Sequence, residues 1–127
     1  MQDLNDVRTM LGLSHVDNEN SVAILIGDRE DSNLLLITQE EDNLHLRVEV
    51  GTLENLIEEG DFNRFAMDVF TSSQLLLPYS VGMIAEEGQD TIVVLEDTVP
   101  LGDFSKDEML NAINSSQRAV NNFQTLV

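Results

Sequence analysis

Acidic side chains are the most abundant groups in this sequence that could do chemistry. There are 24 Asp and Glu residues against 6 Lys and Arg, a formal net charge of −18. Calcium loops place oxygen ligands at positions 1, 3, 5 and 12 around a glycine at position 6. Counted from Asp28, Asn33 takes the glycine position and Gln39, which has no carboxylate, takes position 12. Counted from Asp17, Val22 takes the glycine position. Neither register predicts a specific calcium site.

The other groups that could catalyse a reaction or bind a metal are isolated. The sequence contains no cysteine, which excludes disulfides, thiol catalysis and thiolate ligands. His15 and His45 are far apart in the chain and lack the short spacing of a zinc site. No serine stands in a nucleophile elbow, and no glycine-rich phosphate loop is present. We therefore predict no catalytic residue, no cofactor and no metal ligand. An acidic domain that responds to divalent metal ions stays open as an alternative, and an unrecognised enzyme as a distant one.

The charge also restricts the partners that the protein can bind. A strongly acidic surface repels phosphate groups, so we expect neither nucleic acid nor an anionic membrane as a partner. A basic or apolar segment of another protein is the better match. The N-terminal residues do not read as a signal peptide, and no apolar run reaches the roughly 20 residues that span a bilayer. The sequence thus favours a cytoplasmic protein without membrane insertion.

Residues 61 to 84 are the stretch around which the chain is organised. Apolar residues recur there at the spacing of one helical stripe: Phe62, Phe65, Ala66, Val69 and Phe70. Asp61 can cap the first turn of this helix. Pro78 ends it, because proline has no N–H and disfavours the helical conformation at Leu77. The pattern therefore predicts a central helix that continues to Leu77, followed by a strand.

The rest of the chain supplies the other elements of one domain over residues 1–127. Short apolar or alternating runs predict strands at residues 22–26, 34–38, 44–50, 81–85 and 91–95. A short helix is expected within residues 1–13, and Ser105 with Glu108 forms a capping box that starts the last helix. We predict an α+β fold of order α-β-β-β-α-β-β-α, with a five-stranded, mainly antiparallel sheet and three helices.

Three apolar runs do not alternate, at residues 22–26, 34–37 and 92–95, which is typical of strands buried on both faces. Three helices cover five strands only thinly, so some apolar surface should meet a second chain. Leu75, Leu76 and Leu77 are consecutive and cannot share one helical face, although a local irregularity that buries all three stays open. We predict a homodimer through the central helix or the strand after it. The candidate dimer or partner contacts are Phe70, Leu75, Leu76, Leu77, Tyr79 and Val81.

Two resemblances add to this interpretation. The element order, length, acidity and implied dimer resemble the class I chaperones of type III secretion, which implies their fold and transfers no individual residue. The motifs Phe62-Asn63-x-Phe65 and Leu77-Pro78-Tyr79-Ser80-Val81-Gly82-Met83, with the polar last helix, resemble the uncharacterised bacterial YjfI-like family over the second half of the chain. The association of that family with coat proteins of the phage-shock type implies an accessory role. The main hypothesis is a non-enzymatic, dimeric, chaperone-like module that holds an apolar or basic segment of a partner protein.

Overall fold

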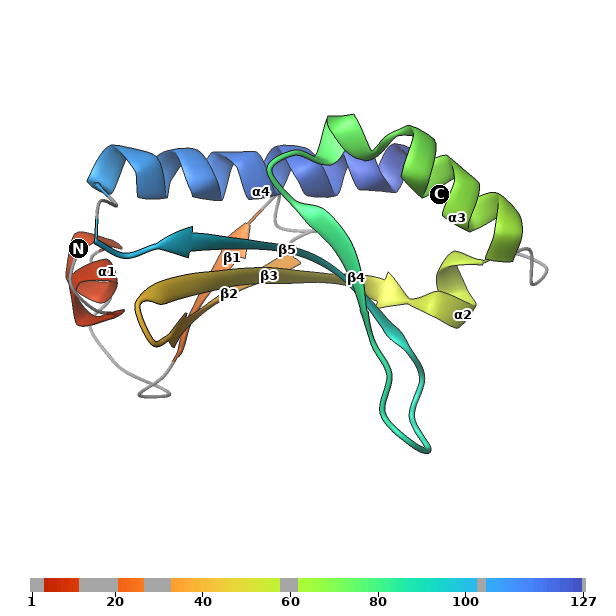
Figure 1. Ribbon diagram of the computed structural model, residues 1–127, viewed down its shortest axis with the longest axis horizontal. Helices are drawn as coiled ribbons and strands as arrows, with labels where there is room; N and C mark the ends of the chain where they lie inside the picture. Colours follow the sequence, from red (N-terminus) through yellow and green to blue (C-terminus); the bar gives the residue numbers. More distant parts are fainter. Residues whose placement is uncertain (1–3, 12–20, 27–32, 58–61, 103–104, 127) are drawn as a thin grey trace.

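The computed structural model of the chain describes residues 4–11, 21–26, 33–57, 62–102 and 105–126. Its elements follow in the order α1 (Leu4–Leu11), β1 (Ser21–Ile26), β2 (Asn33–Glu40), β3 (Asn43–Thr52), α2 (Leu53–Leu56), α3 (Phe62–Thr71), η2 (Ser73–Leu76), β4 (Ser80–Ile84), β5 (Ile92–Pro100) and α4 (Lys106–Leu126) (Figure 1). Asp61, the predicted cap of the central helix, lies outside the described residues. So do Asp17 and Asp28, where the two calcium-loop registers begin.

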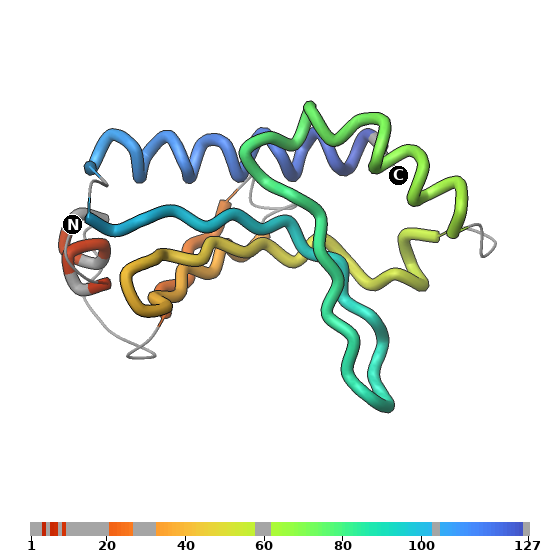
Figure 2. The backbone as a smooth tube through the Cα atoms, in the orientation of Figure 1, coloured from red at the N-terminus to blue at the C-terminus, as the bar shows by residue number. Residues whose placement is uncertain are grey.

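The strands form one five-stranded sheet in the order β1-β2-β3-β5-β4, and every neighbouring pair is antiparallel. This confirms the predicted α+β fold with its antiparallel sheet. β5 runs the length of β3 and is longer than predicted, since its pairing continues to Pro100 opposite Asn43. The hairpin of β4 and β5 projects away from α4 (Figure 2). Gly88 near its tip has a φ of 80°, a left-handed conformation that glycine adopts at little steric cost.

The core lies between the sheet and α4, which crosses one face of the sheet (Figure 1). We call this the inner face. Alternate residues of β3 point to it and are fully buried, namely Leu44, Leu46 and Val48, as their strict alternation predicted. From α4, Met109, Val120 and Phe123 complete the core. The Phe123 ring meets the Phe65 ring of α3 edge to face, with 6.3 Å between the ring centroids.

The start of α4 confirms the first half of the predicted capping box. The N–H of Glu108 donates to Ser105 Oγ at 3.2 Å. The Ser105 hydroxyl also donates to Glu108 Oε1 at 3.2 Å. The cap fixes where α4 begins and therefore which of its residues face the sheet.

The central helix is shorter than predicted, because α3 ends at Thr71. The Thr71 hydroxyl donates to the carbonyl oxygens of Met67 at 2.8 Å and of Asp68 at 3.2 Å. Such side-chain bonds compete with the helical backbone pattern. Ser73–Leu76 then form the 3₁₀ turn η2, and the N–H of Leu75 donates to Ser72 O at 3.0 Å. The three leucines therefore do not form the end of a regular helix.

Burial on both faces holds for one of the three apolar runs and is wrong for the other two. In β5, Val93, Val94 and Leu95 are all buried, although neighbouring residues of a strand point to opposite faces of the sheet. On the face opposite α4, which we call the outer face, Leu25 of β1 is 71% exposed and Leu34 of β2 is 51% exposed. No described helix covers this part of the outer face, so an apolar run alone did not indicate burial.

Candidate interaction surface

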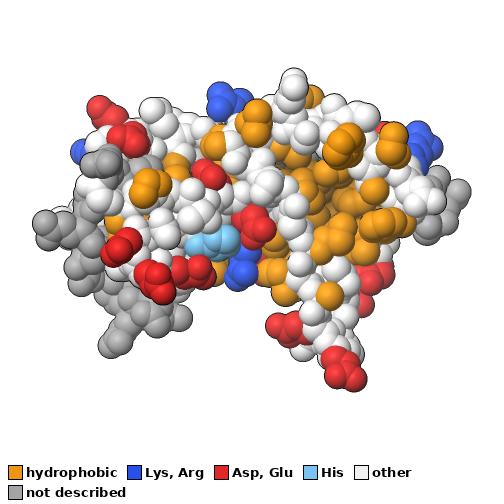
Figure 3. All heavy atoms as spheres, in the orientation of Figure 1, with side chains coloured by type: hydrophobic (Ala, Val, Ile, Leu, Met, Phe, Trp, Pro, Cys, Tyr) orange, Lys and Arg blue, Asp and Glu red, His pale blue; other side chains and the backbone are white. Residues whose placement is uncertain are grey.

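Large apolar side chains are exposed on three consecutive elements, α3, η2 and β4. We define the α3–β4 surface by Met67 and Phe70 of α3, Leu75 and Leu77 in and just after η2, and Met83 of β4, all of them exposed. Figure 3 shows hydrophobic side chains gathered where α3, α2 and β4 border one another in Figure 1. An exposed apolar patch of this kind marks an interaction site more often than an ordinary surface.

The six predicted contact residues fall into two groups. Phe70, Leu75 and Leu77 are 78%, 55% and 62% exposed, and Val81 is half-buried. Leu76 and Tyr79, in contrast, belong to the core and expose 0% and 2% of their surface. Four of the six predicted residues therefore lie at or near the surface: Phe70, Leu75, Leu77 and Val81. The prediction was wrong for Leu76 and Tyr79, which are buried.

The geometry of η2 explains why three adjacent leucines point in different directions. A 3₁₀ turn has three residues per turn, so successive side chains are about 120° apart. When Leu76 points at α4, its two neighbours must point away. The sequence left open whether the leucines form a contact surface or whether a local irregularity buries all three. In the structure the irregular turn buries Leu76 and leaves Leu75 and Leu77 exposed.

Hydrogen bonds fasten this segment to α4. Asn122 Nδ2 donates to the carbonyl oxygen of Leu75 at 2.8 Å, and the Tyr79 hydroxyl donates to the carbonyl oxygen of Ala112 at 3.2 Å. Burial raises the pKa of Tyr79 above its ordinary value, with a further rise from the nearby Asp97 carboxylate, so the hydroxyl stays a donor at neutral pH. These two bonds to α4 hold the backbone on either side of Leu77, and the side chains of Leu75 and Leu77 are exposed.

β4 adds an open sheet edge beside this surface. Within the described strands it pairs with β5 alone and stands last in the sheet. Its sequence from Ser80 to Ile84 contains no charged residue, and charges are a common means of keeping edge strands from pairing. A Cβ at Gly82 would lie 2.7 Å from Glu96 Oε1, so a larger residue there would displace the end of that side chain. The edge can accept a strand from another chain.

Sequence reasoning missed Met67 and Met83 as members of this surface. Met67 stands outside the apolar stripe of α3, where a single methionine gives no pattern. Met83 lies in the predicted strand 81–85, but the sequence did not show which side chains of that strand would stay exposed. Methionine side chains are flexible and polarisable, which suits a surface that adapts to a partner.

The histidine among the described residues lies beside a carboxylate on the outer face of the sheet. His45 on the outer face has its Nδ1 3.2 Å from Thr98 Oγ1 and its Nε2 3.5 Å from a carboxylate oxygen of Glu96. In the described part of the chain, no three residues among His, Asp and Glu are grouped so that they could hold a metal ion. No described helix is long and apolar enough to cross a membrane.

The sheet order and the long helix on one face define the fold found in type III secretion chaperones and in YbjN. Over 98% of both chains, the protein matches a chain of the heterodimeric ExoU–SpcU complex of Pseudomonas aeruginosa, with a TM-score of 0.66 and 13% identity. It also matches YbjN of E. coli, described as a putative transcription regulator, with a TM-score of 0.70 and 10% identity over 95% of this chain and 87% of that one. At these identities the likeness concerns the fold alone.

No protein-family model and no curated protein sequence matches this chain. The resemblance to type III secretion chaperones is therefore supported at the level of the fold. The resemblance to the YjfI-like family stays a prediction.

Proposed function

We propose that the protein is a non-enzymatic, chaperone-like module that forms a homodimer and binds a segment of another protein. The observation that carries the proposal is the α3–β4 surface, where Phe70, Leu75 and Leu77 stand exposed on a segment bonded to α4. Full burial of one leucine or phenylalanine is worth roughly 1.5–3 kcal/mol. A surface with several such side chains favours association with a second chain.

A second copy of the chain is the first partner that this surface fits. Two copies related by a two-fold axis would each bring the same apolar residues to one interface. The uncharged edge of β4 lies beside these residues, so strand pairing can add to the side-chain contacts. The five residues that define this surface are themselves uncharged.

The further partner is a protein with a basic or apolar segment. The formal net charge of −18 favours basic segments over acidic ones. The likeness in fold to a chain of a heterodimeric type III secretion complex supports a role in holding another protein. No observation on the described residues favours the alternative of a metal-responsive domain.

Cross-linking through introduced cysteines tests the dimer surface, since the native sequence has no cysteine that could react. We expect the single variants Phe70→Cys and Leu77→Cys to form covalent dimers with a short bismaleimide. Leu110→Cys is the matched control, because Leu110 is also an exposed apolar residue and lies on α4. Cross-linking that is as efficient at Leu110 as at Phe70 and Leu77 would overturn the assignment of this surface.

A further inference from the structure

The outer face of the sheet carries a second apolar region, separate from the α3–β4 surface. In the register of β1 with β2, Leu25 lies opposite Leu34 and Ala23 lies opposite Leu36. All four side chains belong to the face turned away from α4. Residues on the open face of an antiparallel sheet are normally polar. We call these four residues the β1–β2 face.

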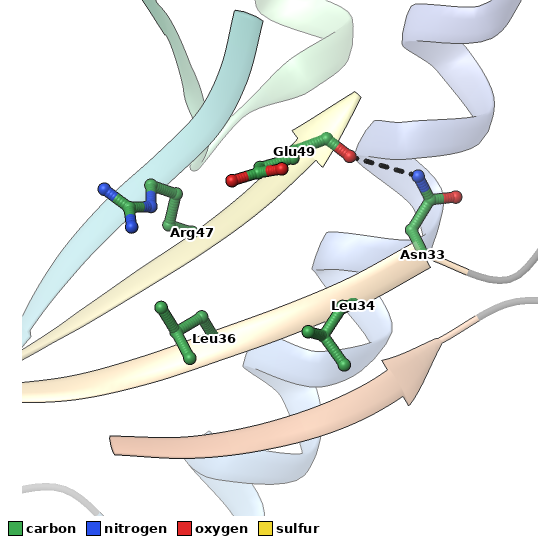
Figure 4. A pocket seen from close by; sticks show the side chains of 5 residues that line it. All are labelled: Asn33, Leu34, Leu36, Arg47 and Glu49. Carbon is green, nitrogen blue, oxygen red and sulfur yellow. Dashed lines mark hydrogen bonds between the residues drawn. The ribbon is translucent and has the colours of Figure 1, made fainter. Parts of the chain in front are cut away.

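A hollow of about 290 Å³ borders the β1–β2 face where β2 meets β3. It is lined by Asn33, Leu34, Leu36, Arg47 and Glu49, and Figure 4 shows the charged side chains on β3 beside the two leucines on β2. Asn33 Nδ2 donates to the backbone oxygen of Glu49 at 3.2 Å and so fixes the end of the hollow. The region thus has an apolar floor and one charged border.

The neighbouring strands limit how wide an occupant can be. Beyond β2 the outward position beside Leu36 is Arg47 on β3, and the next outward position is Glu49. On β5, Glu96 lies opposite Arg47 and the buried Val94 lies opposite Glu49. The apolar floor is therefore two strands wide, roughly 10 Å at the usual strand spacing. A single α-helix has a diameter of about 10–12 Å. The floor matches one helix and is too narrow for a second sheet.

The backbone of the floor also favours a helix. β2 pairs with strands on both sides and β1 with β2, so the main-chain groups under the middle of the floor are used within the sheet. An extended peptide laid on this face would leave its own N–H and C=O groups without partners, whereas a helix satisfies them internally. On the inner face, α4 packs on the same sheet in this manner through Met109, Val120 and Phe123.

The charged border sets a requirement on the sequence of such a helix. Arg47 and Glu49 are two residues apart on one strand, a separation of roughly 6.5 Å along it. Among the described residues, neither forms an ion pair with another side chain. Side chains one turn apart on a helix are separated by about 5–6 Å. An acidic and a basic residue at positions i and i+4 would therefore lie opposite Arg47 and Glu49.

We propose that the β1–β2 face receives one amphipathic helix of a partner protein, with an apolar stripe flanked by an acidic and a basic residue one turn apart. The proposal deepens the proposed function and rests on it, since it names the form and place of the bound segment. Homodimerisation is left to the α3–β4 surface, which lies on other elements.

The test uses a fluorescein-labelled synthetic helix of about 18 residues, or five turns, that carries a leucine stripe and one Glu–Lys pair at i and i+4. Its binding to the full chain is measured by fluorescence anisotropy. We expect saturable binding that weakens about tenfold or more in Leu25→Asp and in Leu34→Asp, because each loses an apolar contact and gains a charge in the floor. Both leucines are exposed, so the variants should fold, which circular dichroism checks.

Two comparisons separate this site from unspecific hydrophobic binding. Leu110→Asp, which changes an exposed leucine of α4, should bind the helix as the native chain does. In Arg47→Glu the Glu–Lys helix should bind more weakly, and a helix with Lys in place of that Glu should regain the affinity. Equal binding by the native chain, Leu25→Asp and Leu34→Asp would overturn the proposal. Loss of helix binding in Phe70→Asp would also overturn it, because that residue belongs to the α3–β4 surface. The same holds if laurate, an apolar ligand without a helix, competes with the labelled helix at equal concentration.

Light scattering on the same samples separates this inference from the proposed function. A native dimer that does not bind the helix overturns the helix site and leaves the homodimer standing. Loss of the dimer in Leu25→Asp would show that a second copy covers the β1–β2 face, which also contradicts the site. A monomeric native chain that binds the helix would contradict the proposed homodimer and support the site.

Discussion

The Tyr79 hydroxyl donates a hydrogen bond to the carbonyl oxygen of Ala112 across 3.2 Å, and so ties the segment between η2 and β4 to the middle of α4. Behind the same segment, Ser116 is buried, and its hydroxyl donates to Ile113 O at 2.6 Å. Leu77 lies two residues before Tyr79 and points outward. The orientation of the exposed leucines therefore depends on a contact made in the core.

Removal of the Tyr79 hydroxyl should destabilise the fold by a modest amount. Tyr79→Phe keeps the ring and loses one hydrogen bond, which is worth about 0.5–1.5 kcal/mol. Urea denaturation followed by circular dichroism measures the change. Ser80→Ala is the control, because the exposed Ser80 hydroxyl makes only a long bond of 3.4 Å to Glu96 O. A Tyr79→Phe variant no less stable than Ser80→Ala would show that the bond does not anchor the segment.

The three adjacent leucines should respond differently to truncation. Leu76→Ala removes a fully buried side chain and should lower the free energy of unfolding by about 2–5 kcal/mol. Leu75→Ala and Leu77→Ala change exposed side chains and should leave the unfolding of an isolated chain within about 0.5 kcal/mol. Urea titrations at a protein concentration low enough to keep the chain monomeric make the comparison. Similar losses for all three would contradict the 3₁₀ geometry of η2.

Asp97 should make the fold more stable as the pH falls. It lies opposite Leu46 on the inner face, where partial burial raises its pKa; the Thr98 N–H and His45 act in the other direction. A folded-state pKa above the unfolded value means that the folded chain binds the proton more tightly. The unfavourable carboxylate is thus present above the folded-state pKa and absent below the unfolded value near 3.9.

The variant Asp97→Asn tests this relation. We expect it to be more stable than the native chain at pH 7, by less than about 1 kcal/mol because the carboxyl is partly solvated. The difference should shrink as the pH is lowered toward 4, and paired urea titrations at several pH values follow it. If Asp97→Asn were instead less stable at pH 7, the ionised carboxylate would be a net stabilising group.

Calcium should not stabilise the protein specifically. The possible calcium loops that begin at Asp28 and Asp17 both lack a complete set of ligands. Among the described residues, no three His, Asp or Glu side chains are grouped so that they could hold a metal ion. A ligand that binds only the folded state raises the melting temperature by mass action. Thermal melts with calcium, magnesium or a chelator at matched ionic strength should therefore agree. A rise specific to calcium would revive the metal-responsive alternative.

The fold followed from local patterns in the sequence. Strict alternation at Leu44, Leu46 and Val48 identified the central strand and its inner face, and Ser105 with Glu108 marked the start of α4. The end of α3 at Thr71 was not predictable from hydrophobic periodicity, because the Thr71 hydroxyl bonds to the carbonyl oxygens of Met67 and Asp68 at a place where the apolar pattern gives no stop signal. The proline at position 78 placed the predicted end at Leu77, six positions later.

The candidate surface was predicted only in part, for a related reason. The sequence showed that three consecutive leucines cannot share one face of a helix. It did not show that a 3₁₀ turn would bury Leu76 between exposed neighbours, since that depends on where α4 passes. Likewise, the apolar runs of β1 and β2 do not reveal which of their two faces a helix covers. Leu25 and Leu34 are exposed because α4 lies on the opposite side of the sheet.

The most direct test of the central claim is the molar mass in solution, measured by light scattering during size exclusion at about 1–100 μM, a range that covers typical homodimer affinities. The native chain should elute with twice the mass of one chain. The double variant that carries both Phe70→Asp and Leu77→Asp should elute with the mass of one chain. Leu110→Asp should remain a dimer. A native chain that stays monomeric throughout this range would contradict the account, as would a dimer that persists when both Phe70 and Leu77 are aspartate.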